Sequence, residues 1–176
     1  DVDDGVQAVE EVVDELERHL DDGAHPVVRR VLQHLLTRLG DLARDADNAD
    51  ALLEVAERAS ALFGRAVAGH VDPVSLARWV VGFRVEYGGW PSLTLEAVAH
   101  AFDEPAWDAY RAGVATLGGG GPAADPYPSE IDRMLLELAD HDGDVEEAVT
   151  LLSGGDRPYY REIIRRLRDA ARPADD

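Results

Sequence analysis

Cysteine and lysine are both missing from the 176 residues, so all 17 cationic side chains are arginine. Without cysteine the chain can form no disulfide, and it offers no thiol nucleophile and no Cys-ligated zinc or iron–sulfur site of its own. No apolar run approaches the roughly 18 residues that a membrane-spanning helix needs, and no signal-peptide core follows Asp1. These absences predict a cytoplasmic protein that does not cross a membrane.

Negative charge dominates what is present, because 36 acidic residues against 17 arginines give a net charge of -19. The contents of 45% hydrophobic and 30% charged residues are otherwise typical of a soluble globular protein. A chain this negative repels nucleic acid and anionic membranes at long range. We therefore expect a protein partner, no membrane partner and no general affinity for nucleic acid.

Hydrophobic residues recur at spacings of three and four, and no segment alternates strictly between apolar and polar residues. This pattern predicts an all-α protein with about nine helices joined mostly by short turns. Such helices can stack as antiparallel αα-hairpins in a degenerate tetratricopeptide-like or HEAT-like array, or they can form a compact helical bundle. No 34-residue period repeats in register, which leaves both architectures open.

Capping residues and prolines predict where the helices begin, and glycines predict where they end. The first helix is expected from Val6, and the second from Pro26 to Gly40. A third helix is expected to finish near Gly69. Further helix starts are predicted at Asp72-Pro73, Thr94, Glu104-Pro105, Ser129, Asp144 and Arg157-Pro158.

Residues 118–128 contain four consecutive glycines and three prolines, but no large aliphatic residue. This composition is typical of a flexible linker. We therefore predict a helical array over residues 1–117, a linker over 118–128, and a C-terminal helical hairpin over 129–176 that ends in an arginine-rich helix.

The segment from Asp140 to Asp144 places three carboxylates at alternate positions, as an EF-hand loop does at its start. The rest of that pattern is missing, because Val145 stands where the loop needs glycine and Leu151 stands where it needs a bidentate Glu. Asp144 fits better as the cap of a helix. We therefore favour a turn between two helices over a calcium site.

The histidines and serines form no recognisable catalytic or metal-binding pattern. His19 and His70 are expected near helix C-termini, where partial positive charge is favoured. The sequence thus predicts no metal, no cofactor and no catalytic residue. The six histidines are His19, His25, His34, His70, His100 and His141.

An aromatic cluster around residues 79–90 is the best candidate for a pocket. Trp79, Glu86, Tyr87 and Trp90 combine aromatic rings with a carboxylate and would suit the lining of a ligand site. The same rings flank the most hydrophobic turn of the chain, and the following pair of glycines ends its helix. Core packing is therefore the favoured interpretation.

The last predicted helix is an exception to the acidic character of the chain. Five of its arginines follow one another at spacings of four, four, three and four, which places them on one helical face opposite Ile163, Ile164 and Leu167. This face can bind an acidic protein surface or a phosphate backbone. A solvated face, neutralised by the surplus of carboxylates, is the simpler alternative. The five arginines are Arg157, Arg161, Arg165, Arg168 and Arg172.

Three segments with aromatic residues carry a further signal: residues 72–79 (DPVSLARW), 89–91 (GWP) and 107–111 (WDAYR). Together they resemble the helical C-terminal region of bacterial SWIM-type zinc-finger proteins. Residues 143–149 (GDVEEAV) and 160–167 (YREIIRRL) are similar to the terminal hairpin of that region, which also occurs in a bacterial helical-repeat family of unknown function. The C-x-C and C-x-H finger of that family has no counterpart here, so no zinc ligand is carried over. The resemblance implies that the finger lies outside this chain, or that the chain is a stand-alone relative of the helical part.

Three functions are compatible with these observations. A non-catalytic helical scaffold or protein-interaction module, accessory to a zinc-finger region elsewhere, accounts for all of them. A nucleic-acid-associated module would bind through the arginines of the last helix. An enzyme would place its site near Trp79, Glu86, Tyr87 and Trp90. We rank these functions in that order and predict that the chain is not an enzyme.

Overall fold

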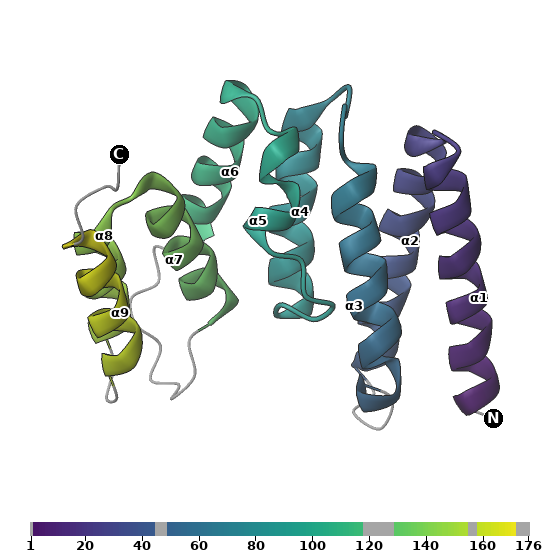
Figure 1. Cartoon of the computed structure of the whole chain (residues 1–176), viewed down its shortest axis with the longest axis horizontal. Coiled ribbons are helices and arrows are strands. Elements are labelled where there is room, and N and C mark those ends of the chain that lie inside the picture. The colour runs from purple at the N-terminus through teal and green to yellow at the C-terminus, as the bar shows by residue number, and fades with distance from the viewer. Residues whose placement is uncertain (1, 45–48, 118–128, 155–157, 172–176) are drawn as a thin grey trace. The chain divides into compact units, whose positions relative to one another are not determined.

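The computed structural model describes residues 2–44, 49–117, 129–154 and 158–171 (Figure 1). Over these ranges the chain has α-helices and one short 3-10 helix and no strand, so the all-α prediction is confirmed. The elements are α1 (Val2–Asp21), α2 (His25–Ala43), α3 (Ala49–Ala66), α4 (Pro73–Tyr87), α5 (Leu95–Val98), η2 (Ala99–Ala101), α6 (Glu104–Leu117), α7 (Glu130–Asp142), α8 (Val145–Ser153) and α9 (Tyr160–Ala170).

The chain divides into two compact units, Asp1–Tyr110 and Arg111–Asp176. The division falls within α6, seven residues before the Leu117 that ends this helix and the expected N-terminal domain. Unit 1 therefore holds α1 to α5, η2 and the start of α6, and unit 2 holds the remaining elements. The predicted linker over residues 118–128 lies outside the described residues.

Side-chain caps begin the helices where the sequence predicts them. The carboxylate of Asp72 accepts a hydrogen bond from the backbone N–H of Ser75 at 3.0 Å, and the Thr94 hydroxyl accepts from that of Ala97 at 3.4 Å. At α8, the Asp144 carboxylate accepts from the Glu147 N–H at 3.0 Å. Each bond satisfies a backbone donor that the first turn of a helix leaves unpaired. At α7, Ser129 and Asp132 form a reciprocal capping box.

Helix ends were predicted less well, and Gly40 shows why. The prediction that α2 ends at Gly40 is wrong, because the helix continues to Ala43 and Gly40 is buried. A Cβ added at Gly40 would lie 2.5 Å from Cδ1 and 2.7 Å from Cγ of Tyr87 in α4. Glycine is needed there for the close approach of two helices. Three other bounds also differ, since α1 begins at Val2 and not Val6, α3 ends at Ala66 and not near Gly69, and α9 begins at Tyr160 and not at Arg157-Pro158.

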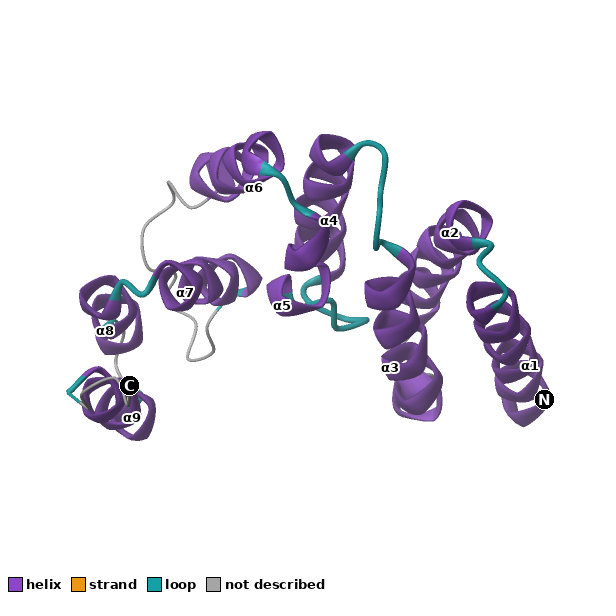
Figure 2. Ribbon diagram, turned by 45° about the horizontal axis from the view of Figure 1, so that its top comes forward, coloured by secondary structure: helices purple, strands orange, loops and turns teal. Residues whose placement is uncertain are grey.

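The core of unit 1 is built around α3, which packs against α1, α2 and α5, while α2 also packs against α4. Figure 2 shows α1, α2 and α3 side by side. The buried aliphatic residues recur at helical spacing, so each helix turns one apolar stripe inward. The largest fully buried side chains of this unit are Tyr110, Phe63, Leu32, Leu36, Leu39, Leu76, Val13, Val28, Val55, Val67 and Val80.

Unit 2 is a smaller assembly in which α7 packs against α8, and α8 packs against α9. Within these three helices, no residue of α9 is buried, and the buried residues belong to α7 and α8. The buried residues of α7 and α8 are Met134, Leu138, Ala139, Ala148 and Leu152.

Arg29 and His70 meet where α3 ends. Arg29 is buried, and its Nη1 donates a hydrogen bond to the carbonyl oxygen of Ala66 at 3.2 Å. This contact satisfies a terminal carbonyl and compensates the negative end of the helix dipole. The Nδ1 atom of His70 accepts from the backbone N–H of Asp72 at 2.9 Å. Burial, and then the charge of Arg29, lower the pKa of His70, so the expectation of positive charge at this histidine is wrong.

We expect the burial of His70 beside Arg29 to make the stability of unit 1 depend on pH. A histidine in the unfolded chain has a pKa of about 6.5, and the pKa of His70 in the folded chain is lower. The unfolded state therefore binds more protons between the two values, and the stabilisation is lost as the pH falls from about 6.5 through the folded pKa. His70→Asn keeps an acceptor near the position of Nδ1 and does not titrate.

The measurement is the free energy of unfolding of wild type and H70N between about pH 5 and about pH 8. We expect the difference to shift in favour of H70N as the pH falls. A difference that stays constant over this range would contradict the role assigned to His70.

Candidate functional site

Three arginines of α9 lie in the solvent on one side of the helix. Arg161 and Arg168 are exposed and form no ion pair with another residue that the structure describes. Arg165 has 61% of its side chain exposed, and among the described residues it pairs with Glu162, one turn away, at 2.7 Å. Exposed pairs of this kind contribute little to stability. Two further predicted members of this face, Arg157 and Arg172, lie outside the described residues.

Arg166 has a different role from its neighbours. Its Nε and Nη2 atoms donate to the two carboxylate oxygens of Asp140 in α7, at 2.7 and 2.6 Å, and its Nη1 donates to Glu162 at 3.0 Å. Only 13% of its side chain is exposed. The hydrogen bond with Asp140 is the main reason why the pKa of Arg166 is raised. This two-point contact attaches α9 to α7 and fixes which side of α9 faces outward.

Apolar side chains lie beside the exposed arginines. Tyr160, Ile164 and Leu167 are 67%, 47% and 50% exposed. The spacing predicts that Ile164 and Leu167 lie on the face opposite the arginines. This prediction is wrong, because both side chains are exposed to solvent beside Arg161 and Arg168. Each apolar position is followed by an arginine, and successive helical positions differ by only about 100°. We call this exposed surface the α9 face; it consists of Tyr160, Arg161, Ile164, Arg165, Leu167 and Arg168.

The aromatic candidates are connected mainly by packing. The ring of Trp79 stacks on Phe83 with centroids 4.9 Å apart and contacts Phe63 of α3 at 5.1 Å. Phe83 in turn contacts the ring of Tyr87 at 5.1 Å. Rows of offset or tilted rings are a favourable way to fill a helix interface. Trp90 is half-buried just after α4, and its backbone N–H donates to the Tyr87 carbonyl at 3.2 Å.

Glu86 and Tyr87 link α4 to the end of α2. Arg44 forms an ion pair with Glu86, and its guanidinium lies 5.1 Å from the centre of the Tyr87 ring. The Tyr87 hydroxyl donates to a carboxylate oxygen of Asp41 at 3.0 Å. Burial and this hydrogen bond raise the pKa of Tyr87. Both side chains thus already have partners within the fold.

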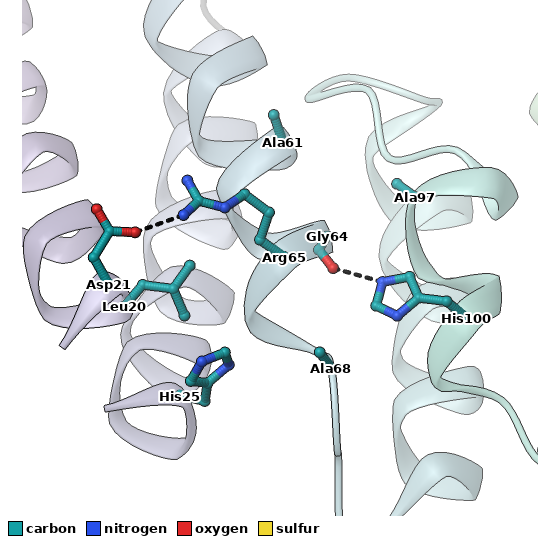
Figure 3. A pocket seen from close by; sticks show the side chains of 9 residues that line it. All are labelled: Leu20, Asp21, His25, Ala61, Gly64, Arg65, Ala68, Ala97 and His100. Carbon is teal, nitrogen blue, oxygen red and sulfur yellow. Dashed lines mark hydrogen bonds and ion pairs between the residues drawn. The ribbon is translucent and has the colours of Figure 1, made fainter. Parts of the chain in front are cut away.

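A cleft of about 620 Å³ lies elsewhere in unit 1 (Figure 3), and sequence analysis missed it. Its floor is the face of α3 that carries Ala61 and Gly64, with Ala68 just after the end of the helix, between the turn that joins α1 to α2 and the η2 segment. His100 Nε2 donates to the Gly64 carbonyl at 2.7 Å across one side. A local pattern does not predict a contact between residues 36 positions apart. None of the four predicted pocket residues lines this cleft.

The polar groups of the cleft are largely used by the fold. Arg65 donates to Asp21 at 2.7 Å and to Glu17 at 2.9 Å. The Nδ1 atom of His25 is buried without a hydrogen-bond partner, although the His25 residue as a whole is only half-buried. The cleft therefore presents small apolar side chains and satisfied ion pairs, with no converging set of free polar groups to bind a ligand.

The acidic turn after α7 confirms the predicted cap. Asp140 binds Arg166, Asp142 accepts from Arg111 at 2.6 Å, and Asp144 caps α8. Gly143 ends α7 with a φ of 71°, which glycine adopts without strain. Each carboxylate of the EF-hand-like segment is thus engaged in the fold.

Among the residues that the structure describes, no group of three or more His, Cys, Asp or Glu side chains is arranged to hold a metal ion. In the same ranges, every helix is too short or too polar to cross a membrane.

Comparison with known proteins gives no match: no protein-family model, no curated protein and no solved structure is similar to this chain. The resemblance to the helical region of SWIM-type proteins therefore stays a prediction from the sequence segments that carry it.

Proposed function

We propose that the chain is a non-catalytic protein-interaction module that binds its partner through the α9 face. The observation that carries the proposal is the exposure of Tyr160, Ile164 and Leu167 next to Arg161, Arg165 and Arg168 on a helix with no buried residue. Tyrosine and arginine are the residue types that protein interfaces favour at their centres. An apolar stripe bordered by arginine fits a partner whose surface is apolar and acidic.

The sequence resemblance extends this proposal. It places the module beside a zinc-finger region that lies outside these residues, with the helices as its accessory scaffold. A reaction near Trp79 is not part of the proposal, since Glu86 and Tyr87 already bind Arg44 and Asp41. Nucleic-acid binding is the alternative that the exposed arginines favour, and the experiment below separates it from protein binding.

The test is capture of the tagged chain from cells that produce it, with a photo-reactive phenylalanine analogue in place of Tyr160. We expect a crosslinked protein that is recovered whether or not nuclease is added. R161E/R165E/R168E should lose it, because charge reversal removes the attraction for an acidic surface. R30E/R38E/R78E changes the net charge equally at three exposed arginines elsewhere, and it should retain the partner.

Two outcomes would contradict the proposal. Recovery that disappears with nuclease would assign the α9 face to nucleic acid. Equal crosslinking by both triple variants would show that the arginines of α9 do not select the partner.

A further inference from the structure

A second exposed helix face carries the opposite charge. On α3, Asp50, Glu54 and Glu57 are exposed and form no ion pair with another described residue. Leu53, which lies between them, is 46% exposed. Positions 50, 53, 54 and 57 lie on one side of a helix. We call these four residues the α3 face.

The free carboxylates of the α3 face differ from those of α1, which have partners. Asp14 accepts from Arg58 at 2.5 Å, and Asp21 accepts from Arg65 at 2.7 Å. Those ion pairs join α1 to α3 within unit 1. The α3 face therefore has negative charge that the described residues leave without a partner, on a protein that is otherwise rich in local ion pairs.

The α3 face and the α9 face share one residue pattern with opposite charge. In both, charged residues stand at positions i, i+4 and i+7, and a branched aliphatic residue stands at i+3. On α3 these are Asp50, Leu53, Glu54 and Glu57, and on α9 they are Arg161, Ile164, Arg165 and Arg168.

Pairing the two faces therefore brings a carboxylate opposite an arginine at three levels along the helices. In an antiparallel pair, Asp50 comes opposite Arg168, Glu54 opposite Arg165, and Glu57 opposite Arg161, while Leu53 lies beside Ile164. Seven residues of helix extend about 10 Å, so all the contacts fit within two turns. Reversing one helix changes the spacing of four and three to three and four, which shifts the middle positions by only about 1.5 Å.

We propose that the partner of the α9 face is a second copy of this chain, bound through its α3 face. This inference rests on the proposed function, because it names the occupant of the same α9 face. The contact covers two helical turns, so we expect weak association, with a dissociation constant on the order of 100 µM. The net charge of -19 on each copy opposes association at low salt. At about 0.15 M salt the Debye length is about 8 Å, which screens the long-range repulsion more than the contact pairs.

The test is sedimentation equilibrium of the full chain at about 0.15 M salt, from about 10 µM to about 500 µM. We expect the average mass of the wild type to rise with concentration above that of the 19.1 kDa monomer. R161E/R165E/R168E and D50R/E54R/E57R should each weaken the association at least about tenfold. Circular dichroism of each variant checks that its helices are intact.

The two variants distinguish a specific contact from general repulsion. Each replacement in D50R/E54R/E57R adds two positive charges, so the net charge falls from -19 to -13 and overall repulsion decreases. The specific pairing nevertheless predicts that this variant dissociates. An equimolar mixture of the two triple variants should associate again, because each reversed face meets its complement. R30E/R38E/R78E and E11R/E96R/D108R are the matched controls at exposed positions, and both should behave as the wild type does.

A wild type that remains monomeric at about 500 µM would overturn this pairing. So would a mixture of the two triple variants that stays monomeric. If the monomeric chain still crosslinks a cellular protein through α9 and R161E/R165E/R168E loses it, the pairing fails while the proposed function stands.

Discussion

Phe63→Ala is expected to lower the free energy of unfolding of unit 1 by about 3–5 kcal/mol. Phe63 has no exposed surface, and its ring contacts Trp79 with centroids 5.1 Å apart. Truncation removes the buried ring and leaves a cavity that the surrounding helices fill only in part. The substitution therefore measures how firmly α3 and α4 are packed together beside the aromatic cluster.

Tryptophan fluorescence during urea unfolding is the natural measurement. Trp79, Trp90 and Trp107 are the three tryptophans of the chain, and all three lie in unit 1. Val71→Ala serves as the control, because Val71 is 91% exposed and its truncation should cost less than about 0.5 kcal/mol. A loss below about 1 kcal/mol for Phe63→Ala would indicate a loosely packed region and would favour the pocket interpretation of Trp79.

Gly40→Ala should destabilise unit 1 by about 1–3 kcal/mol, although alanine is the better helix former by about 1 kcal/mol. The added Cβ would lie 2.5 Å from Cδ1 of Tyr87, and both the ring and the α4 backbone that carries it must shift to relieve the overlap. The steric cost at this crossing of α2 and α4 should outweigh the gain in helix propensity.

Gly82→Ala is a matched control for Gly40→Ala. Gly82 also lies inside a helix, α4, but a Cβ there would meet no atom within 4 Å. We expect this substitution to stabilise unit 1 by about 0.5–1 kcal/mol. Equal effects of the two substitutions in urea unfolding would show that Tyr87 does not restrict the approach of α2 to α4.

Local chemistry explains which features the sequence predicts correctly. Asp72, Thr94, Ser129 and Asp144 each cap a helix, because a cap requires only a side-chain acceptor and a backbone donor a few residues away. The period of the apolar residues likewise predicts the all-α fold, since it is a property of each helix by itself.

Features that depend on contacts between distant residues were not predicted. The glycine at position 40 has the sequence signature of a helix end, but its role is set by Tyr87 in another helix. The hydrogen bond between His100 and Gly64 forms one side of the cleft, and the sequence around neither residue contains a pattern that predicts it.

The candidate site was predicted in part. Spacing correctly places Arg161, Arg165 and Arg168 together on one exposed side of α9. It does not indicate that Arg166 alone turns toward Asp140, nor that Ile164 and Leu167 remain half exposed. A helical period gives the direction of each side chain around the helix axis. Which direction faces the neighbouring helix depends on the partners that the fold provides.

The attachment of α9 has a consequence for the exchange of its amide hydrogens. Because this helix buries no side chain and is joined to α7 by the Arg166 pair with Asp140, it should open locally at a lower free energy than α7 or α8. Its amides should exchange with solvent first in unit 2. Any occupant that requires α9 to be helical then slows this exchange, so that binding and helix order on α9 form a single linked equilibrium.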